Sequence, residues 1–112
     1  LLFGYGINDY VQTQSSVFTN SIWIHVAVVY DANQLTDPEK VKIYVNGINQ
    51  QLDFSNPVAN SLDATNSNVR IASSSDDDRF FSGQIDDVRI YNYALTPTQI
   101  KTIMNSGTVN FQ

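Results

Sequence analysis

Three aspartates stand next to one another in the stretch RIASSSDDDRFFSG, which covers residues 70–83. Adjacent carboxylates repel one another unless water or a cation separates them, and calcium takes about six to eight oxygen ligands in loosely defined geometry. The stretch is therefore either a solvated polar loop, which we rank first, or a calcium loop. Its candidate metal ligands are Ser75, Asp76, Asp77 and Asp78, and candidates from other loops are Asn8, Asp9, Asp31 and Asn33.

A second pair of carboxylates, Asp86 and Asp87, is poorly placed for catalysis. Glycoside hydrolysis needs two carboxyl groups facing one bond, whereas adjacent residues of a strand point to opposite faces. We expect a bulge here, at which one aspartate caps turn amides or pairs with Arg89. His25 has no Ser or Cys partner at a motif spacing, so we expect a buried, hydrogen-bonded imidazole. These patterns predict a domain that is not an enzyme.

Aromatic and amide side chains are the other residues that could bind a ligand. Exposed aromatic rings offer faces for sugars, and amides hydrogen-bond to their hydroxyl groups. We expect Trp23 to pack in the core instead. The candidate ligand-binding residues are Tyr44, Asn46, Phe80, Tyr91, Asn92 and Tyr93.

Charge and length exclude several classes of partner. The net charge is −5 with only 6 Lys and Arg residues, which leaves no basic patch for nucleic acid or an anionic membrane. No stretch approaches the roughly 18 apolar residues of a membrane span, so we expect no membrane insertion. A chain of 112 residues fits a single domain, 1–112. Because it opens on LLFGYG without a Met, we expect it to be part of a longer chain.

The apolar pattern predicts an all-β fold, an antiparallel β-sandwich of jelly-roll type with one short helix near the C-terminus. The run Ile22–Tyr30 predicts a strand buried on both faces. Val41–Val45 alternates, and Asn46-Gly47 then predicts a two-residue type I′ hairpin turn. Further strands are expected over residues 68–74 and 80–93, with weaker candidates over 1–6, 9–14 and 108–112.

The predicted helix follows ALTPTQIKTIMNSG, residues 94–107. Thr96 is a good N-cap, Pro97 suits the first helical position, and Gln99 completes a capping box. Ile100 belongs to the apolar face, and Gly107 can end the helix.

Three segments resemble, in order, the laminin-G-like jelly rolls of the concanavalin A-like lectin and glucanase superfamily, which includes the pentraxins. They read WIHVAVVYD, VKIYVNG and FFSGQIDDVRIYNYALTPTQI, and the resemblance covers roughly residues 20–106. It implies that 80–93 is the closing strand and that the acidic loop before it lies where pentraxins bind calcium. Members of the family are usually longer at the N-terminus, so either the sandwich is reduced or strands come from upstream or from another subunit. An open sheet edge would then favour self-assembly.

Two function classes follow, and the fold alone does not choose between them. The first, which we favour narrowly, is a non-catalytic recognition module, extracellular or at the cell surface, that binds a glycan or an extracellular protein with the help of calcium or without it. The alternative is a structural or assembly domain of a surface filament, adhesin or viral appendage. A second alternative is an accessory domain of a glycoside hydrolase.

Overall fold

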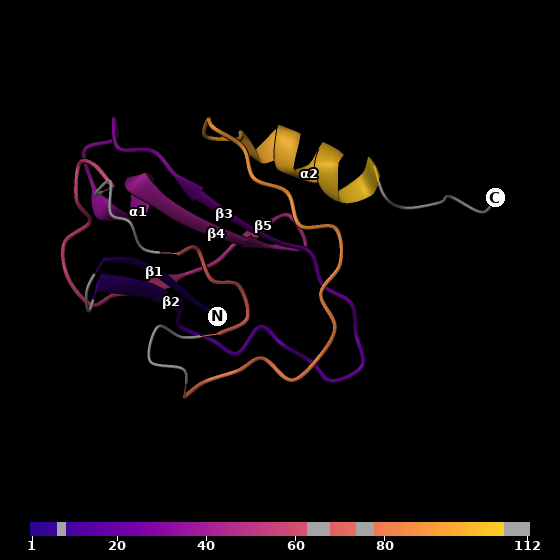
Figure 1. The fold of residues 1–112 in the computed structure, drawn as a ribbon. Helices are drawn as coiled ribbons and strands as arrows, with labels where there is room; N and C mark the ends of the chain where they lie inside the picture. The colour runs from indigo at the N-terminus through magenta and orange to yellow at the C-terminus, as the bar shows by residue number, and fades with distance from the viewer. Residues whose placement is uncertain (7–8, 63–67, 74–77, 107–112) are drawn as a thin grey trace.

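The computed structural model describes residues 1–6, 9–62, 68–73 and 78–106 (Figure 1). The described part of the chain is mostly β, with two sheets and a helix near the C-terminus. In chain order its elements are β1 (Leu2–Gly6), β2 (Asp9–Thr13), β3 (Val26–Tyr30), α1 (Asp37–Lys40), β4 (Val41–Val45), β5 (Ile48–Asn49), β6 (Leu52–Phe54) and α2 (Pro97–Ser106). The expected β-rich fold with one C-terminal helix is confirmed.

The strands form two antiparallel three-stranded sheets, ordered β1-β2-β6 and β3-β4-β5. The chain passes from the second sheet back to the first between β5 and β6. One buried cluster holds Val11 of β2 together with Val41 and Ile43 of β4, so the two sheets pack face to face as the layers of a sandwich. Figure 1 shows α2 on the outer side of the sheet that contains β3 and β4.

The hairpin between β4 and β5 forms where the sequence predicts it. Asn46 and Gly47 both have positive φ angles, 49° and 76°, as a type I′ turn requires. Val45 then pairs with Ile48. The turn supports α2 as well, because a Cβ atom added to Gly47 would lie 3.1 Å from Cγ of Lys101.

Helix α2 begins as the capping box predicts. The amide of Thr96 donates to Oε1 of Gln99 at 2.8 Å, and the amide of Gln99 donates to Oγ1 of Thr96 at 3.2 Å. Ile100 is fully buried, which confirms the apolar face. The predicted helix end at Gly107 and the weak strand 108–112 lie outside the described residues.

Helix α1 is a short helix that the apolar pattern of the sequence does not predict. Thr36 precedes it, and its amide and hydroxyl both donate to Oε2 of Glu39, at 3.2 and 2.7 Å. This contact has the spacing of a capping box, S/T-x-x-E.

The two strands predicted over residues 68–74 and 80–93 are not formed in the part of the chain that the structure describes. An isolated bridge joins Ser73 and Phe80, and residues 80–93 are otherwise irregular and exposed. A strand is stabilised by its partners more than by its own pattern. Asp87 has a φ of 54°, which breaks the extended conformation in the middle of the segment.

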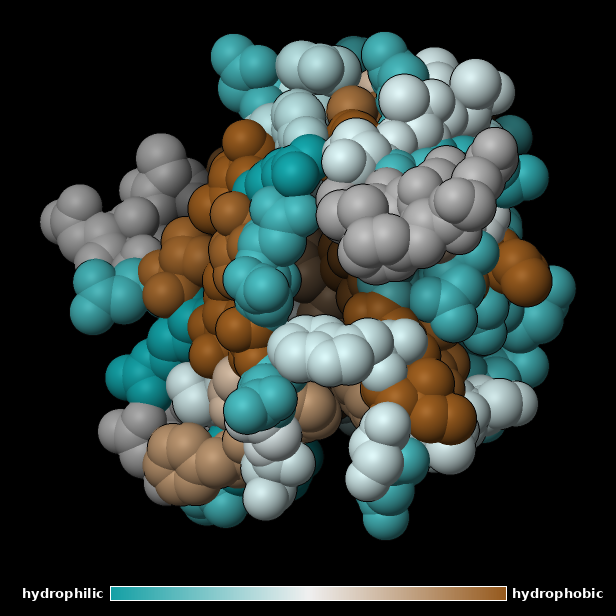
Figure 2. Space-filling view, turned by 90° about the vertical axis from the view of Figure 1, so that its right-hand side faces the viewer, coloured by the Kyte–Doolittle hydropathy of each residue, from teal (hydrophilic) through white to brown (hydrophobic). Residues whose placement is uncertain are grey.

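Strand β3 is shorter and more exposed than predicted. It begins at Val26 instead of Ile22, and β4 is its one neighbour in the described sheet. Val26 and Val28 are 36% and 38% exposed, so the prediction of burial on both faces was wrong. Trp23 precedes the ladder and is 65% exposed, so its expected core position was also wrong. Figure 2 shows one face of the molecule, on which a hollow lies between hydrophobic groups.

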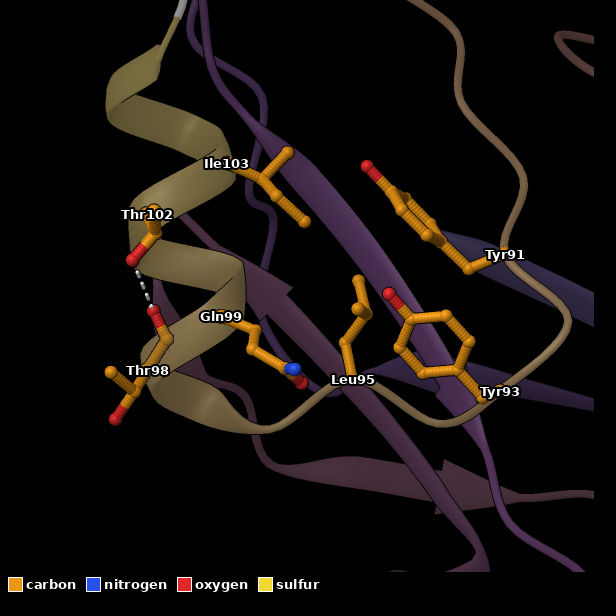
Figure 3. Close-up of a pocket in the computed structure, with 7 residues that line it drawn as sticks. All are labelled: Tyr91, Tyr93, Leu95, Thr98, Gln99, Thr102 and Ile103. Atoms are coloured by element: carbon orange, nitrogen blue, oxygen red, sulfur yellow. Dashed lines mark hydrogen bonds between the residues drawn. The ribbon is translucent and has the colours of Figure 1, made fainter.

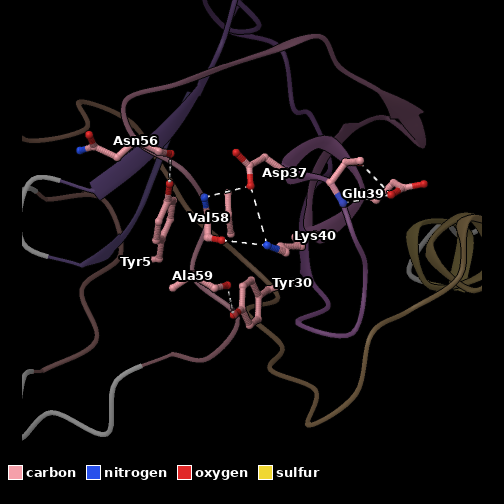
Figure 4. A network of polar contacts seen from close by, with 9 residues as sticks. Tyr5, Tyr30, Asp37, Glu39, Lys40, Asn56, Val58 and Ala59 are labelled. Atoms are coloured by element: carbon pink, nitrogen blue, oxygen red, sulfur yellow. Dashed lines mark hydrogen bonds and ion pairs between the residues drawn. The ribbon is translucent and has the colours of Figure 1, made fainter.

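Four side chains hold the segment after β6 against the sandwich (Figure 4). The amide of Val58 donates to Oδ1 of Asp37 at 3.0 Å, and Nζ of Lys40 donates to the carbonyl of Val58 at 3.0 Å. The hydroxyls of Tyr5 and Tyr30 donate to the carbonyls of Asn56 and Ala59. Lys40 is buried, and its ammonium group lies 3.9 Å from Asp37. The network connects α1 and both sheets to residues 56–59.

Replacing Lys40 with Ala should destabilise the domain. The substitution leaves the Val58 carbonyl without its donor and Asp37 without its cation, and an unpaired buried group costs about 1–3 kcal/mol. Denaturant unfolding monitored by circular dichroism measures the loss. Arg79→Ala, at a cation whose side chain is 77% exposed, is the control and should change the free energy of unfolding by less than about 0.5 kcal/mol. Equal losses in the two variants would contradict the role given to the network.

Candidate ligand-binding site beside the C-terminal helix

An open cleft of about 300 Å³ lies between α2 and the segment that leads into it (Figure 3). Tyr91 and Tyr93 form one wall, with ring centroids 5.9 Å apart and planes at 72°, an edge-to-face arrangement. Both tyrosines are exposed. The cleft is lined by Tyr91, Tyr93, Leu95, Thr98, Gln99, Thr102 and Ile103.

The opposite wall of the cleft is polar and comes from the first turns of α2. The amide oxygen of Gln99 accepts the Thr96 amide, which fixes this side chain at the mouth. The hydroxyl of Thr102 donates to the carbonyl of Thr98 at 3.0 Å and keeps its lone pairs as acceptors. An aromatic wall opposite amide and hydroxyl groups can hold a ring that has one apolar face and a polar edge.

A second, smaller hollow of about 130 Å³ adjoins the cleft on the side of β3. Tyr91, Leu95 and Ile103 line both spaces, so the two are neighbours, and together we call them the groove. The remaining residues of the inner hollow are His25, Val26, Ala27, Val28, Asp87, Arg89 and Ile100.

Asp87 and Arg89 form an ion pair at the rim of the inner hollow. Nε and Nη2 of Arg89 donate to the two carboxylate oxygens of Asp87 at 2.8 and 2.9 Å. The Asp87 amide donates to Oδ1 of Asp86 at 2.7 Å. These contacts confirm the expectation that one aspartate accepts a turn amide and that one pairs with Arg89. The Asp87 carboxylate is the main cause that raises the pKa of Arg89.

His25 is the residue immediately before β3, and it lines the inner hollow. The hairpin turn fixes its backbone. Its amide donates to Oδ1 of Asn46 at 2.9 Å, and the Asn46 amide donates to the His25 carbonyl at 2.8 Å. The imidazole is half-buried, and its Nδ1 is buried with no hydrogen-bond partner. The expectation of a hydrogen-bonded imidazole was therefore wrong. Burial lowers the pKa of His25; among the smaller effects, Asp87 raises it and Arg89 lowers it.

The structure brings two of the six candidate ligand residues together, Tyr91 and Tyr93. Tyr44 is only 5% exposed and offers no free ring face, and the side chain of Asn46 is occupied by the His25 amide. Phe80 and Asn92 are exposed and do not line the groove. The sequence reasoning missed the polar wall, Thr98, Gln99 and Thr102, although helical spacing places these residues on the turns that follow the tyrosines.

Most of the candidate calcium loop lies outside the described residues, namely Ser75, Asp76 and Asp77. Asp78 is described; it is exposed, and one carboxylate oxygen lies 3.8 Å from Nε of Arg79.

The candidate metal ligands from other loops have neighbours of their own. Asp31 accepts the Asn33 amide and the Gln34 side chain, and Asp9 accepts the Asn56 side chain. Asn8 is outside the described part. Within residues 1–6, 9–62, 68–73 and 78–106, no three His, Cys, Asp or Glu side chains are grouped as metal ligands.

The fold defines a small β-sandwich domain with a C-terminal helix. Residues 3–101 match the family model described as the concanavalin A-like lectin/glucanases superfamily, of laminin G type. The chain belongs to this family, as its three resembling segments predict. Among curated proteins, no sequence matches the chain.

A solved structure is also similar to this domain. It is the 2.1 Å crystal structure of residues 221–444 of an S-layer domain-containing protein from Clostridium thermocellum ATCC 27405, with 26% sequence identity and a TM-score of 0.55. The match covers 86% of the present chain and 50% of that one, so the chain spans about half the length of the related structure. None of the described helices is long and apolar enough to cross a membrane.

Lowering the pH through the His25 titration should destabilise the fold. The folded-state pKa of His25 lies below the unfolded value of about 6.5, so the unfolded chain takes up the proton first. The free energy of unfolding should be constant above about pH 6.5 and should decrease as the pH falls below that value. Denaturant unfolding at about pH 7.5 and about pH 5.5 measures the change.

The matched variant for this prediction is His25→Gln, which removes the titrating group and should show a flat profile over the same window. The acids whose pKa values are lowered, Asp31 and Glu39, lose their contribution only at more acidic pH, as they are protonated. A decline of equal size in the variant would show that another group causes it.

Proposed function

We propose that this chain is a non-catalytic recognition module at the cell surface that binds neutral glycans in the cleft between Tyr91, Tyr93 and α2. The observation that carries the proposal is the exposed edge-to-face tyrosine pair opposite the amide and hydroxyls of α2. Membership in the concanavalin A-like lectin/glucanases superfamily and similarity to an S-layer domain-containing protein support a glycan ligand and a surface location.

The chemistry of the cleft favours a neutral sugar over other ligands. Its lining contains no Lys, Arg, Asp or Glu among the described residues, so it offers neither a cation for phosphate nor carboxylates for glycoside hydrolysis. The net charge of −5 disfavours anionic partners. Calcium bound by Ser75, Asp76, Asp77 and Asp78, which would assist glycan binding, is a separate part of the proposal.

Binding of neutral oligosaccharides tests the proposal. In calorimetric and NMR titrations with cellotetraose, xylotetraose and mannotetraose, at least one should bind, and Tyr93→Ala should weaken it about fivefold to a hundredfold, since one stacked aromatic contributes about 1–3 kcal/mol. Tyr10→Ala, at an exposed tyrosine of β2, is the control and should bind as the wild type does. Sialyllactose serves as an anionic comparator.

The same titrations repeated in millimolar calcium and in EGTA test the metal. If calcium assists binding, affinity and melting temperature should both be higher with calcium. Unchanged values would remove the metal from the proposal and leave the glycan site, whereas no binding of any tetrasaccharide would overturn the glycan site.

A second candidate function, an assembly domain, is favoured by the open edge of β3. This edge has no strand beside it in the described sheet, and Val26 and Val28 are partly exposed next to it. An unpaired edge with apolar side chains can accept a strand from another copy. Similarity to an S-layer domain-containing protein is consistent with such a role.

If β3 is an assembly edge, the purified chain should self-associate as its concentration rises, and Val28→Lys should make it monomeric, because a lysine on an edge strand opposes strand pairing. Sedimentation velocity measures the mass. Ile48→Lys, at the exposed opposite edge of the same sheet, is the matched control and should still associate. A wild-type chain that stays monomeric at high concentration would exclude this function.

A further inference from the structure

We infer that the inner hollow beside His25 is a subsite for one terminal, uncharged sugar ring of the same glycan, and that occupancy of this subsite is linked to deprotonation of His25. The inference rests on the proposed glycan function and deepens it. Tyr91, Leu95 and Ile103 line both spaces, so a glycan chain bound on Tyr93 lies next to the hollow.

The size and position of the hollow suit the end of a glycan chain. Its volume of about 130 Å³ is less than half that of the outer cleft, and β3 and the buried Ile100 are among its walls. One ring-sized group can enter, while a longer segment must remain in the outer cleft. Val26, Ala27 and Val28 of β3 add no charge to the lining of the hollow.

The polar groups of the hollow suit hydroxyls and disfavour an ionic ligand. Asp87 and Arg89 neutralise each other through two hydrogen bonds, so together they add no net charge. The pair presents carboxylate lone pairs and guanidinium N–H groups side by side, which can pair with neighbouring hydroxyls of a sugar. Asp87 is held in this position by a left-handed backbone conformation, which stores strain at the rim.

His25 supplies the link to pH. Its imidazole lacks a protein hydrogen-bond partner among the described residues, and the charged groups that act on it are Asp87 and Arg89. The remaining lining of the hollow carries no charge, and the lysine of α2, Lys101, lies against the Gly47 turn. A neutral ligand would exclude water from the imidazole and leave these two charges balanced, so it would favour the neutral form further. An anionic ligand would favour the charged form.

His25 is the only histidine of the chain, so its imidazole resonances can be read without assignment by mutation. The experiment is an NMR titration of these resonances against pH, in the free protein and in protein saturated with whichever of cellotetraose, xylotetraose or mannotetraose binds. The pKa of His25 should be lower in the complex. Affinity should then fall on acidification, by up to about tenfold for each unit by which binding lowers this pKa.

Two variants complete the test. Asp87→Asn should weaken the tetrasaccharide severalfold, whereas Tyr93→Ala should weaken it without removing the dependence on pH. If the tetrasaccharide binds and depends on Tyr93, but the His25 pKa and Asp87→Asn affinity are unchanged, the subsite is wrong and the glycan cleft stands. A His25 pKa that rises on binding also overturns the subsite. If no tetrasaccharide binds, the cleft and the subsite both fail.

Discussion

Strand β4 is buried on both faces, and both layers of the domain depend on that burial. Val41 and Ile43 project into the cluster between the sheets, while Tyr44, which pairs with Ala27, belongs to the face covered by α2. A strand that is apolar on both faces can pack against the opposite sheet with one face and against a helix with the other, and no further element is needed between them. The groove described above depends on this arrangement, because β3, the neighbour of β4, lines it on one side and α2 lines it on the other.

The groove is built from an irregular segment of the chain that lies between regular elements. Residues 87–95 have no ladder of their own, and their positions follow from the ion pair of Arg89, the tyrosine ring contact and the capping box at Thr96. Such side-chain contacts allow a backbone that presents polar groups at irregular spacing, which a strand with a period of two residues does not. Binding groups on loops carried by a rigid scaffold are common in β-sandwich folds.

Short sequence motifs predicted correctly those elements that are stabilised by residues adjacent in the sequence. The Asn46-Gly47 turn and the Thr96–Gln99 capping box are each specified by a few adjacent residues, and both form as predicted. The strand over residues 80–93 failed because its apolar alternation requires a neighbouring strand, and alternation does not reveal whether that neighbour is present. The burial of Trp23 was predicted wrongly for the same reason, because its burial would require another segment of the chain to cover β3.

The candidate site was predictable only in part, because its members meet through tertiary packing. Tyr91 and Tyr93 could be chosen as exposed aromatics, but Tyr44 belongs to the same residue class and is buried. Nothing in the local sequence indicates that His25 lies beside Asp87, more than sixty positions away, in a hollow that α2 closes.

The close contact between Gly47 and Lys101 restricts how the domain can change during evolution. Hairpin turns usually tolerate insertions because they project into solvent, but here the turn supports a helix. Gly47 is buried, with a φ of 76°, and has no room for a larger residue unless the Lys101 stem moves. An insertion at this turn would displace α2 and, with it, one whole wall of the groove. Members of the family that retain the groove should therefore vary in length at other loops and keep this turn at two residues.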